Sequence, residues 1–390
     1  MLSPRYRCNI LILNDMIWAG ITLLALYIGG NTYLFIRLWQ LVAQQPLWLR
    51  IGFILLFAVV ATSLFVSFAL RNANLPTPLT QTLFGIGSTW LVFLLYTVIL
   101  LIVTDVIKFL CPTFQYGTLY ALGATLLLLL FGYINYRNPR VEHLEITTDK
   151  SLDRDNYRIV MASDIHLGYG TTRRDLARYI ELINSQQPDV VVIAGDLIDN
   201  SIKPVAEDDM CAEFSRVMAR DGIYMCAGNH EYISGIDAVE EYLSTSNIHL
   251  LRDDVVRLPS GISIIGRDDR MNRNRTPLEE LATQCEEQDF VVVLDHQPKS
   301  VMRDADASFN EMQNIASHSN LHLSGHTHRG QIWPLNWLTD AIYGQSHGHR
   351  KWGDSCHVVV SSGLSLWGPP FRIGTQSEIW VIDIKSEIKE

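Results

Sequence analysis

The first 136 residues carry very little charge, and this constrains the fold more than any other feature. Four stretches within them have no charged side chain and are long enough to cross a bilayer, which takes about 20 residues: residues 16–36, 51–70, 83–104 and 116–136. Trp and Tyr side chains, which favour the membrane interface, stand at their edges. Buried helices of a large soluble protein are the alternative, but four such runs in succession favour a transmembrane region.

The few charges that remain lie between the stretches or near their ends, not at mid-depth. A transporter would more often keep ionisable groups or broken helices there, so we interpret the four helices as an anchor and a lipid-facing platform. Both ends of four spans lie on one side of the membrane. Five basic residues fall on that side and three on the other, which favours a cytoplasmic catalytic domain in a multi-pass protein of the cell membrane. The two groups are Arg5, Arg7, Arg71, Arg137 and Arg140, against Arg37, Arg50 and Lys108.

The rest of the chain has the composition of an acidic soluble domain. Of 31 basic and 41 acidic residues in all, 25 and 39 lie beyond residue 136, a net charge of −14. This argues against nucleic acid as the main partner, because binding phosphate backbones takes clustered Lys and Arg. Small phosphorylated substrates stay possible, since bound metal ions can supply positive charge. We expect a transmembrane region at 1–140 and a catalytic domain at 141–390, and no protein partner is implied.

Five apolar segments of this second part each end in metal-capable side chains. The segments are 157–163, 190–194, 223–227, 290–294 and 321–324, and all read as buried strands. We further predict strands at 144–147 and 263–266, and helices at 172–185, 209–219 and 236–243. Ligands of open α/β sheets gather beyond the carboxyl ends of the strands. Any one of these side chains could be a cap or a turn residue, but the repetition predicts a common site.

The candidate ligands combine carboxylate, imidazole and amide groups and include no cysteine. They are Asp164, His166, Asp196, Asn229, His296, His326 and His328. Such a set suits a borderline divalent cation, Mn, Fe or Zn, and differs from a thiolate-rich structural zinc site. Seven ligands exceed what one ion needs, so we expect two ions, roughly 3.5–4 Å apart as in two-metal phosphoryl-transfer sites.

The ordered series DIH, GDLID, GNHE, DH and GHTH resembles the calcineurin-like metallophosphoesterase superfamily over about residues 157–383. The segments SGHTHRGQIWP at 324–334 and SSGLSLWGPPFRIG at 361–374 are similar to a membrane-associated bacterial branch with transmembrane helices ahead of the catalytic domain. The resemblance implies an α/β fold, a four-layer αββα sandwich preceded by a four-helix transmembrane region.

The resemblance also implies a role for each candidate residue. One metal would be held by Asp164, His166 and His328, and the other by Asn229, His296 and His326. Asp196 would bridge them, and a metal-bridging hydroxide would attack the phosphorus. His230 would protonate the leaving oxygen or stabilise charge on the phosphoryl oxygens. Asp199 and Glu231 would orient their neighbours.

Three features are less determined. Arg329 stands where the branch usually has glycine, and is either a substrate contact or a solvated charge. Arg372, after two prolines, is a second candidate for contact with a substrate phosphate. Residues 333–352 are rich in aromatic and imidazole groups, which fits either a lid on the bilayer interface or a packed loop.

Together these observations predict a membrane-anchored, dinuclear-metal phosphohydrolase that cleaves a phosphodiester or pyrophosphate bond. The anchor favours a lipid-linked substrate, for which a UDP-diacylglucosamine-type glycolipid precursor is the example that superfamily relatives supply. Two alternatives stay open. One is a non-hydrolytic membrane sensor or scaffold that binds through a phosphoesterase-like domain. The other is a nuclease, which conflicts with the net charge of −14.

Overall fold

The computed structural model describes residues 4–70, 75–298, 305–353 and 355–387, with side chains described from residue 18 onward and, in α10, from residue 309. The chain forms two compact units, Met1–Leu130 and Phe131–Glu390, which divide within a helix. The boundary expected from composition, at residue 140, stays a prediction.

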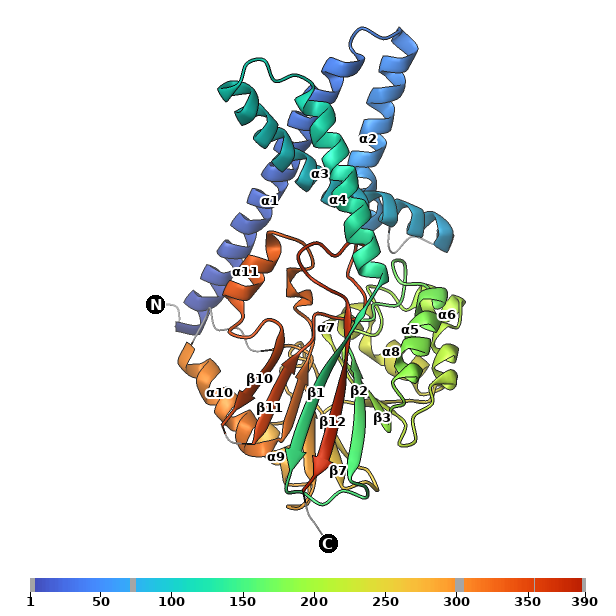
Figure 1. Cartoon of the computed structure of the whole chain (residues 1–390), viewed down its shortest axis with the longest axis vertical. Helices are drawn as coiled ribbons and strands as arrows, with labels where there is room; N and C mark the ends of the chain where they lie inside the picture. Colours follow the sequence, from blue (N-terminus) through green and yellow to red (C-terminus); the bar gives the residue numbers. More distant parts are fainter. Residues whose placement is uncertain (1–3, 71–74, 299–304, 354, 388–390) are drawn as a thin grey trace. The chain divides into compact units, whose positions relative to one another are not determined.

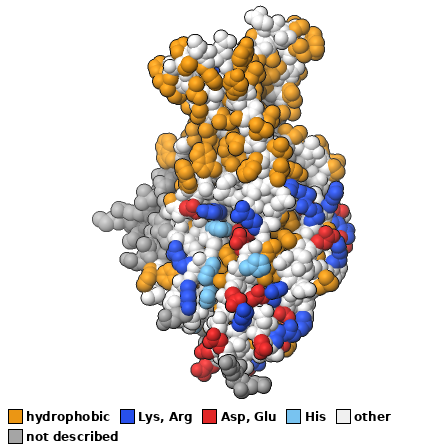
Figure 2. Space-filling model, viewed as in Figure 1, with side chains coloured by type: hydrophobic (Ala, Val, Ile, Leu, Met, Phe, Trp, Pro, Cys, Tyr) orange, Lys and Arg blue, Asp and Glu red, His pale blue; other side chains and the backbone are white. Residues whose placement is uncertain are grey.

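Four long helices make up the first unit (Figure 1): α1 (Pro4–Val42), α2 (Leu47–Ala69), α3 (Thr77–Leu110) and α4 (Gly117–Arg137), whose last turns belong to the second unit. Each of the four predicted stretches falls on one of them. Gly20–Val42 within α1 and all of α2, α3 and α4 are long and apolar enough to cross a membrane. Hydrophobic side chains cover the surface of this unit, whereas Lys, Arg, Asp and Glu gather on the second (Figure 2).

The second unit contains two six-stranded sheets. The first has the order β1-β12-β2-β3-β4-β5 and the second the order β10-β11-β9-β8-β7-β6. The bounds in the first sheet are β1 (Arg140–Thr148), β12 (Glu378–Ser386), β2 (Asn156–Ala162), β3 (Val190–Ala194), β4 (Ile223–Cys226) and β5 (Ile248–Leu251). Those in the second are β10 (Gly348–Trp352), β11 (Cys356–Val360), β9 (Leu321–Ser324), β8 (Phe290–Leu294), β7 (Ile262–Gly266) and β6 (Asp254–Arg257).

The strands that carry the predicted ligands run parallel within each sheet. Strands β2 to β5 form one parallel run, and β7, β8, β9 and β11 form the other. Strand β12 is antiparallel to β2, and the edge strands β6 and β10 are antiparallel to their neighbours. The carboxyl ends of the ligand-bearing strands of each sheet therefore lie at one edge.

Helices cover the outer face of each sheet. On the first sheet these are α5 (Arg173–Ser185), α6 (Lys203–Glu207), the 3₁₀ helix η1 (Met210–Arg216), α7 (Asn229–Ser234) and α8 (Ile236–Leu243). On the second they are α9 (Leu278–Ala282) and α10 (Ala305–His318), and the 3₁₀ turn η2 (His328–Gly330) and α11 (Leu335–Ile342) follow β9. Strand β3 illustrates why both faces are apolar: Val191 and Ile193 pack toward the helices, while Val190 and Val192 pack between the sheets. The four-layer αββα fold is thus confirmed.

One predicted helix has a different form. Residues 209–219 were expected to be α-helical, but only 210–216 are helical, as the 3₁₀ helix η1. Asp209 has a left-handed φ of 43°, so it does not take the extended conformation of a helix N-cap, and Val217 is already extended.

Candidate metal centre

The loops after β2, β3, β4, β8 and β9 bring the predicted ligands together at one edge of the two sheets. Among the described residues, three groups of side chains place one ligand atom each within 4.8 Å of the others. The groups are Asp164–His166–His328, Asp196–His296–His326 and His166–Asp199–His230. The first two contain six of the seven predicted ligands.

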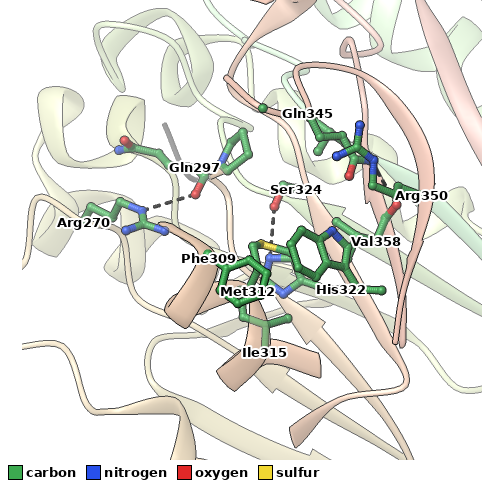
Figure 3. A pocket seen from close by; sticks show the side chains of 14 residues that line it. Arg270, Gln297, Phe309, Met312, Ile315, His322, Ser324, Gln345, Arg350 and Val358 are labelled. Carbon is green, nitrogen blue, oxygen red and sulfur yellow. Dashed lines mark hydrogen bonds between the residues drawn. The ribbon is translucent and has the colours of Figure 1, made fainter. Parts of the chain in front are cut away.

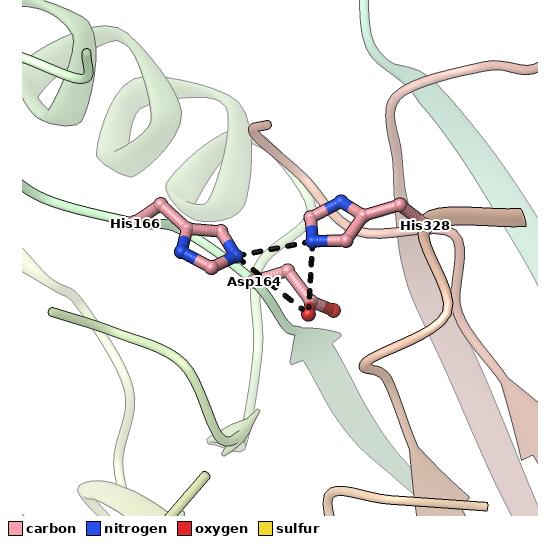
Figure 4. A group of neighbouring side chains, drawn as sticks. All are labelled: Asp164, His166 and His328. Atoms are coloured by element: carbon pink, nitrogen blue, oxygen red, sulfur yellow. Dashed lines mark hydrogen bonds and ion pairs between the residues drawn. The ribbon is translucent and has the colours of Figure 1, made fainter. Parts of the chain in front are cut away.

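The first group lies between the ends of β2 and β9 (Figure 4). The Nε2 atoms of His166 and His328 are 3.1 Å apart. The Oδ1 atom of Asp164 lies 3.9 Å from the Nε2 of His166 and 3.5 Å from that of His328. Three ligand atoms thus converge on one point.

The second group is joined to the first by Asp196. The Oδ2 of Asp196 lies 3.1 Å from the Nε2 of His296 and 3.8 Å from the Nε2 of His166. Asn229, the seventh predicted ligand, has its Oδ1 2.8 Å from the Nδ1 of His326. Asp196 therefore stands between the two groups, as a bridging carboxylate must.

The backbone of the centre is held in conformations that side chains other than glycine rarely adopt. Five of the seven predicted ligands have positive φ, between 46° and 69°. They are Asp164, His166, Asp196, His326 and His328. Such residues cost about 1–3 kcal/mol each and cluster at functional sites.

Close backbone approach explains two of the glycines in the motifs. A Cβ on Gly228 would lie 2.2 Å from the Oδ1 of Asp196, and a Cβ on Gly325 would lie 2.3 Å from the Oδ2 of Asp164. Any larger residue at either position would displace a predicted ligand.

Burial and mutual charge shift the pKa values of the donors in different directions. Burial raises the pKa of Asp164, and the neighbouring carboxylates raise the pKa values of His166 and His296 against the effect of burial, whereas those of Asp196, His326 and His328 are lowered. Burial raises the pKa of Asp196, but His296, His166 and His230 together hold it below its ordinary value. Burial, together with His296, lowers the pKa of His326 to about 3, and burial holds that of His328 well below its usual range. The Nδ1 of His296 is 2.8 Å from the Ala194 carbonyl, to which it donates, and its buried Nε2 has no hydrogen-bond partner. An ionised Asp196 and neutral rings at His326 and His328 fit metal binding.

Asp199 and Glu231 contact the groups that they were expected to orient. The Oδ1 of Asp199 lies 2.8 Å from the Nδ1 of His230 and 3.5 Å from that of His166. Burial raises the pKa of Asp199, but the imidazoles of His166 and His230 hold it below its usual range. Glu231 accepts hydrogen bonds from the backbone N–H groups of Asp196, Ile198 and Gly228, which ties the second and third loops together.

The two arginines proposed as substrate contacts have different surroundings. Arg372 is fully buried, and its guanidinium donates to four backbone carbonyls, those of His328, Ser362, Gly363 and Ser365, at 2.5–3.0 Å. Arg372 therefore holds the backbone of the loop that carries His328, a role that the sequence pattern did not indicate. Arg329 has a partly exposed side chain, with its Nε 3.9 Å from the Oδ1 of Asp340.

The carboxylate of Asp295, which precedes His296, is paired with arginine side chains. Its Oδ2 accepts a hydrogen bond from Arg275 at 2.6 Å and lies 3.9 Å from Arg267 and Arg270. Burial raises the pKa of Asp295, but these three guanidinium groups lower it to about 2. The clustered arginines of segment 267–275 are the sequence signal of this contact.

The predicted aromatic segment lies beside the centre. It contains α11, on which Trp337 and Leu338 are 63% and 56% exposed, and Tyr343, whose ring lies 6.3 Å from that of His326. The segment is therefore neither wholly packed nor remote from the predicted metals.

Comparison with known proteins identifies the class. Residues 157–330 match the model of the calcineurin-like phosphoesterase family. The chain is 32% identical to a metallophosphoesterase of Helicobacter pylori over 63% of this chain and 64% of that protein. It is 30% identical to a metallophosphoesterase of Bacillus subtilis over 66% of this chain and 90% of that protein. A zebrafish transmembrane protein with a metallophosphoesterase domain is 31% identical over 69% of this chain and 62% of its own length.

The fold, the centre and these matches define a metallophosphoesterase. The chain belongs to the calcineurin-like phosphoesterase family, and its candidate membrane helices agree with the transmembrane relatives. The chain spans just under two thirds of the length of the Helicobacter relatives it matches.

Proposed function

We propose that this metallophosphoesterase is a membrane-anchored phosphohydrolase that uses two divalent metal ions, Mn, Fe or Zn, to cleave a phosphodiester or pyrophosphate bond. The observation that carries the proposal is the position of Asp196 between two groups of ligand atoms, 3.1 Å from His296 and 3.8 Å from His166. Asp164, His166 and His328 would hold one ion, and Asn229, His296 and His326 the other.

When bound, such ions act as Lewis acids and lower the pKa of water. The protein itself handles the proton of the leaving group. The Nδ1 of His230 lies 2.8 Å from the Oδ1 of Asp199, so this carboxylate is placed to orient the ring. His230 is 9% exposed, at the border of the centre, and its Nε2 is the atom that would give a proton to the departing oxygen.

A lipid-linked substrate is the finer part of the proposal, with a UDP-diacylglucosamine-type precursor as its example. Two observations support it. The chain has four helices apolar enough to cross a membrane. In addition, α11 directly follows the last metal loop and exposes Leu335, Trp337 and Leu338, side chains that favour a membrane interface. The distribution of basic residues supports a cytoplasmic catalytic domain.

Hydrolysis of a chromogenic phosphodiester by the detergent-purified full-length chain tests the activity. We expect turnover with Mn²⁺, its loss on adding chelator, and its loss in Asp196→Asn. The matched control is Asp237→Asn, which removes one exposed carboxylate on α8 and should leave turnover unchanged. Absence of turnover, or turnover that survives both chelator and Asp196→Asn, would overturn the proposal. A second assay with UDP-diacylglucosamine against its deacylated analogue tests the lipid; equal kcat/KM values would remove this part alone.

A further inference from the structure

A cavity of about 200 Å³ opens beside the metal centre, between the outer face of the second sheet and α10 (Figure 3). Two of its lining residues adjoin predicted ligands in the chain: Gln297 follows His296, and Ser324 lies two residues before His326. Gly344 also lines it, directly after Tyr343, whose ring is 6.3 Å from that of His326. The cavity is therefore a neighbour of the proposed reaction site.

Most of the cavity wall is apolar and partly aromatic. Its apolar lining residues are Pro298, Phe309, Met312, Ile315, Trp352, Val358 and Val360, and Arg270 and Arg350 also line it. The rings of Phe309 and Trp352 are 5.9 Å apart at an angle of 56°. Aromatic walls of this kind favour a flat ring over a flexible polar chain. The volume is small by the standard of whole ligands, so it suits one part of a substrate.

His322, at the floor of this cavity, offers an open hydrogen-bond acceptor. The hydroxyl of Ser324 donates to the Asp295 carbonyl at 2.6 Å, so at its 3.3 Å contact with the Nε2 of His322 it accepts. The Nε2 therefore carries the hydrogen, and the Nδ1 has a lone pair. Burial lowers the pKa of His322 to about 4, so the ring stays neutral. Its Nδ1 is buried without a partner, and the residue is 4% exposed.

Gln345 supplies a second acceptor. Its Nε2 donates to the carbonyls of Gly348 at 2.7 Å and Val358 at 3.1 Å, which fixes the orientation of the amide. The Oε1 is then the atom left over, and it is buried without a partner. Two buried acceptors in this largely apolar wall are costly unless a donor reaches them, at about 1–3 kcal/mol each.

We propose that this cavity binds the part of the substrate beyond the scissile phosphoryl group, and that this part is a planar nitrogen heterocycle with N–H donors, such as a nucleobase. The inference rests on the proposed phosphohydrolase function and deepens it. The aromatic side chains would stack on the ring, while His322 and Gln345 would accept its N–H groups. A heterocycle without N–H donors would leave both acceptors unpaired and bind more weakly.

Three chromogenic esters with the same leaving group test this proposal: the p-nitrophenyl esters of adenosine 5′-monophosphate and thymidine 5′-monophosphate, and p-nitrophenyl phenylphosphonate. With the full-length chain and Mn²⁺, we expect kcat/KM for at least one nucleoside ester to exceed that for the phenylphosphonate by about tenfold or more. His322→Leu and Gln345→Leu should each remove most of this preference, mainly by raising KM for the nucleoside esters.

His322→Asn keeps an acceptor near the position of Nδ1 and should retain part of the preference, which separates recognition from folding. The matched control is His349→Leu, since His349 lies on β10 outside the cavity. Equal kcat/KM on all three esters, or a preference that survives His322→Leu and Gln345→Leu, would overturn this inference. The proposed phosphohydrolase function would then still stand. Absence of turnover on every ester would overturn the proposed function, and the inference with it.

Discussion

The Nδ1 of His230 lies 2.8 Å from the Oδ1 of Asp199. The same carboxylate oxygen is 3.5 Å from the Nδ1 of His166, so Asp199 faces the proposed general acid and a proposed metal ligand at once. It is almost fully buried, and its pKa is held below the usual range by those two imidazoles, against the effect of burial. One side chain therefore couples the acid to the metal centre.

Asp199→Asn should lower kcat by about 10- to 100-fold, the usual cost of losing such a supporting contact. The reason is that the variant removes the carboxylate charge that faces the ring of His230, the proposed general acid. Because Asp199 is not itself a proposed ligand, the metal content should fall far less than the activity. Steady-state kinetics and metal analysis on one preparation check this, with the exposed Asp208→Asn as the control. Loss of metal in proportion to loss of kcat would identify Asp199 as a ligand instead.

The two histidines of the last loop should serve different metals. His328 belongs to the group with Asp164 and His166, and His326 to the group with Asp196 and His296. His326→Ala and His328→Ala should each weaken one site, so that partial chelation removes a different ion from each variant. Titration with a mixture of Mn²⁺ and Zn²⁺ measures how much of each ion each variant binds. Identical loss of both ions from both variants would contradict the assignment.

Replacing Arg372 should lower the stability of the folded protein. Its buried guanidinium donates to four carbonyls, and Arg372→Met would leave them without partners. We expect a loss of about 3–5 kcal/mol, the range for breaking a buried charged contact. Arg329→Gln removes a partly exposed charge and should change stability by less than about 0.5 kcal/mol. Thermal unfolding of both variants in detergent decides, and an unchanged Tm for Arg372→Met would exclude this role.

The metal loops could be predicted from the sequence because each apolar strand ends abruptly in a short motif. The bounds expected for residues 190–194, 290–294 and 321–324 agree with strands β3, β8 and β9. Uniformly apolar runs indicated strands covered on both faces, whereas the αββα arrangement was what the family resemblance implied. The seven ligand candidates followed from the same repetition.

Long-range pairing was not visible in the pattern. Strand β12 lies between β1 and β2 although more than 200 residues separate it from either, and no motif marks it. The contact of Arg372 with the His328 carbonyl joins residues that are far apart in the sequence, so the pattern could not indicate it. Likewise, the acceptors of His322 and Gln345 come together only through the packing of β9 against β11.

The buried His322 should make the protein less stable as the pH falls. Its folded pKa is about 4, below its ordinary value of 6.5, because burial, with Arg267 and Arg270, lowers the pKa more than Asp295 and Glu311 raise it. Between pH 6.5 and 4 the unfolded chain takes up a proton that the folded chain refuses. Stability is therefore lost across this window, by up to about 3 kcal/mol, and no further below it. His322→Leu should show a smaller fall in Tm from pH 7 to pH 5 than the unchanged protein; an equal fall would contradict a neutral His322.

The number of metal ions bound per chain tests the central claim most directly. We predict that the purified full-length protein contains about two ions per chain after saturation with Mn²⁺ and removal of unbound metal ions. Asp196→Asn should contain one or fewer, because the bridging carboxylate lies within reach of both groups. A single ion per chain in the unchanged protein, or two ions that persist in Asp196→Asn, would contradict a dinuclear centre built on Asp196.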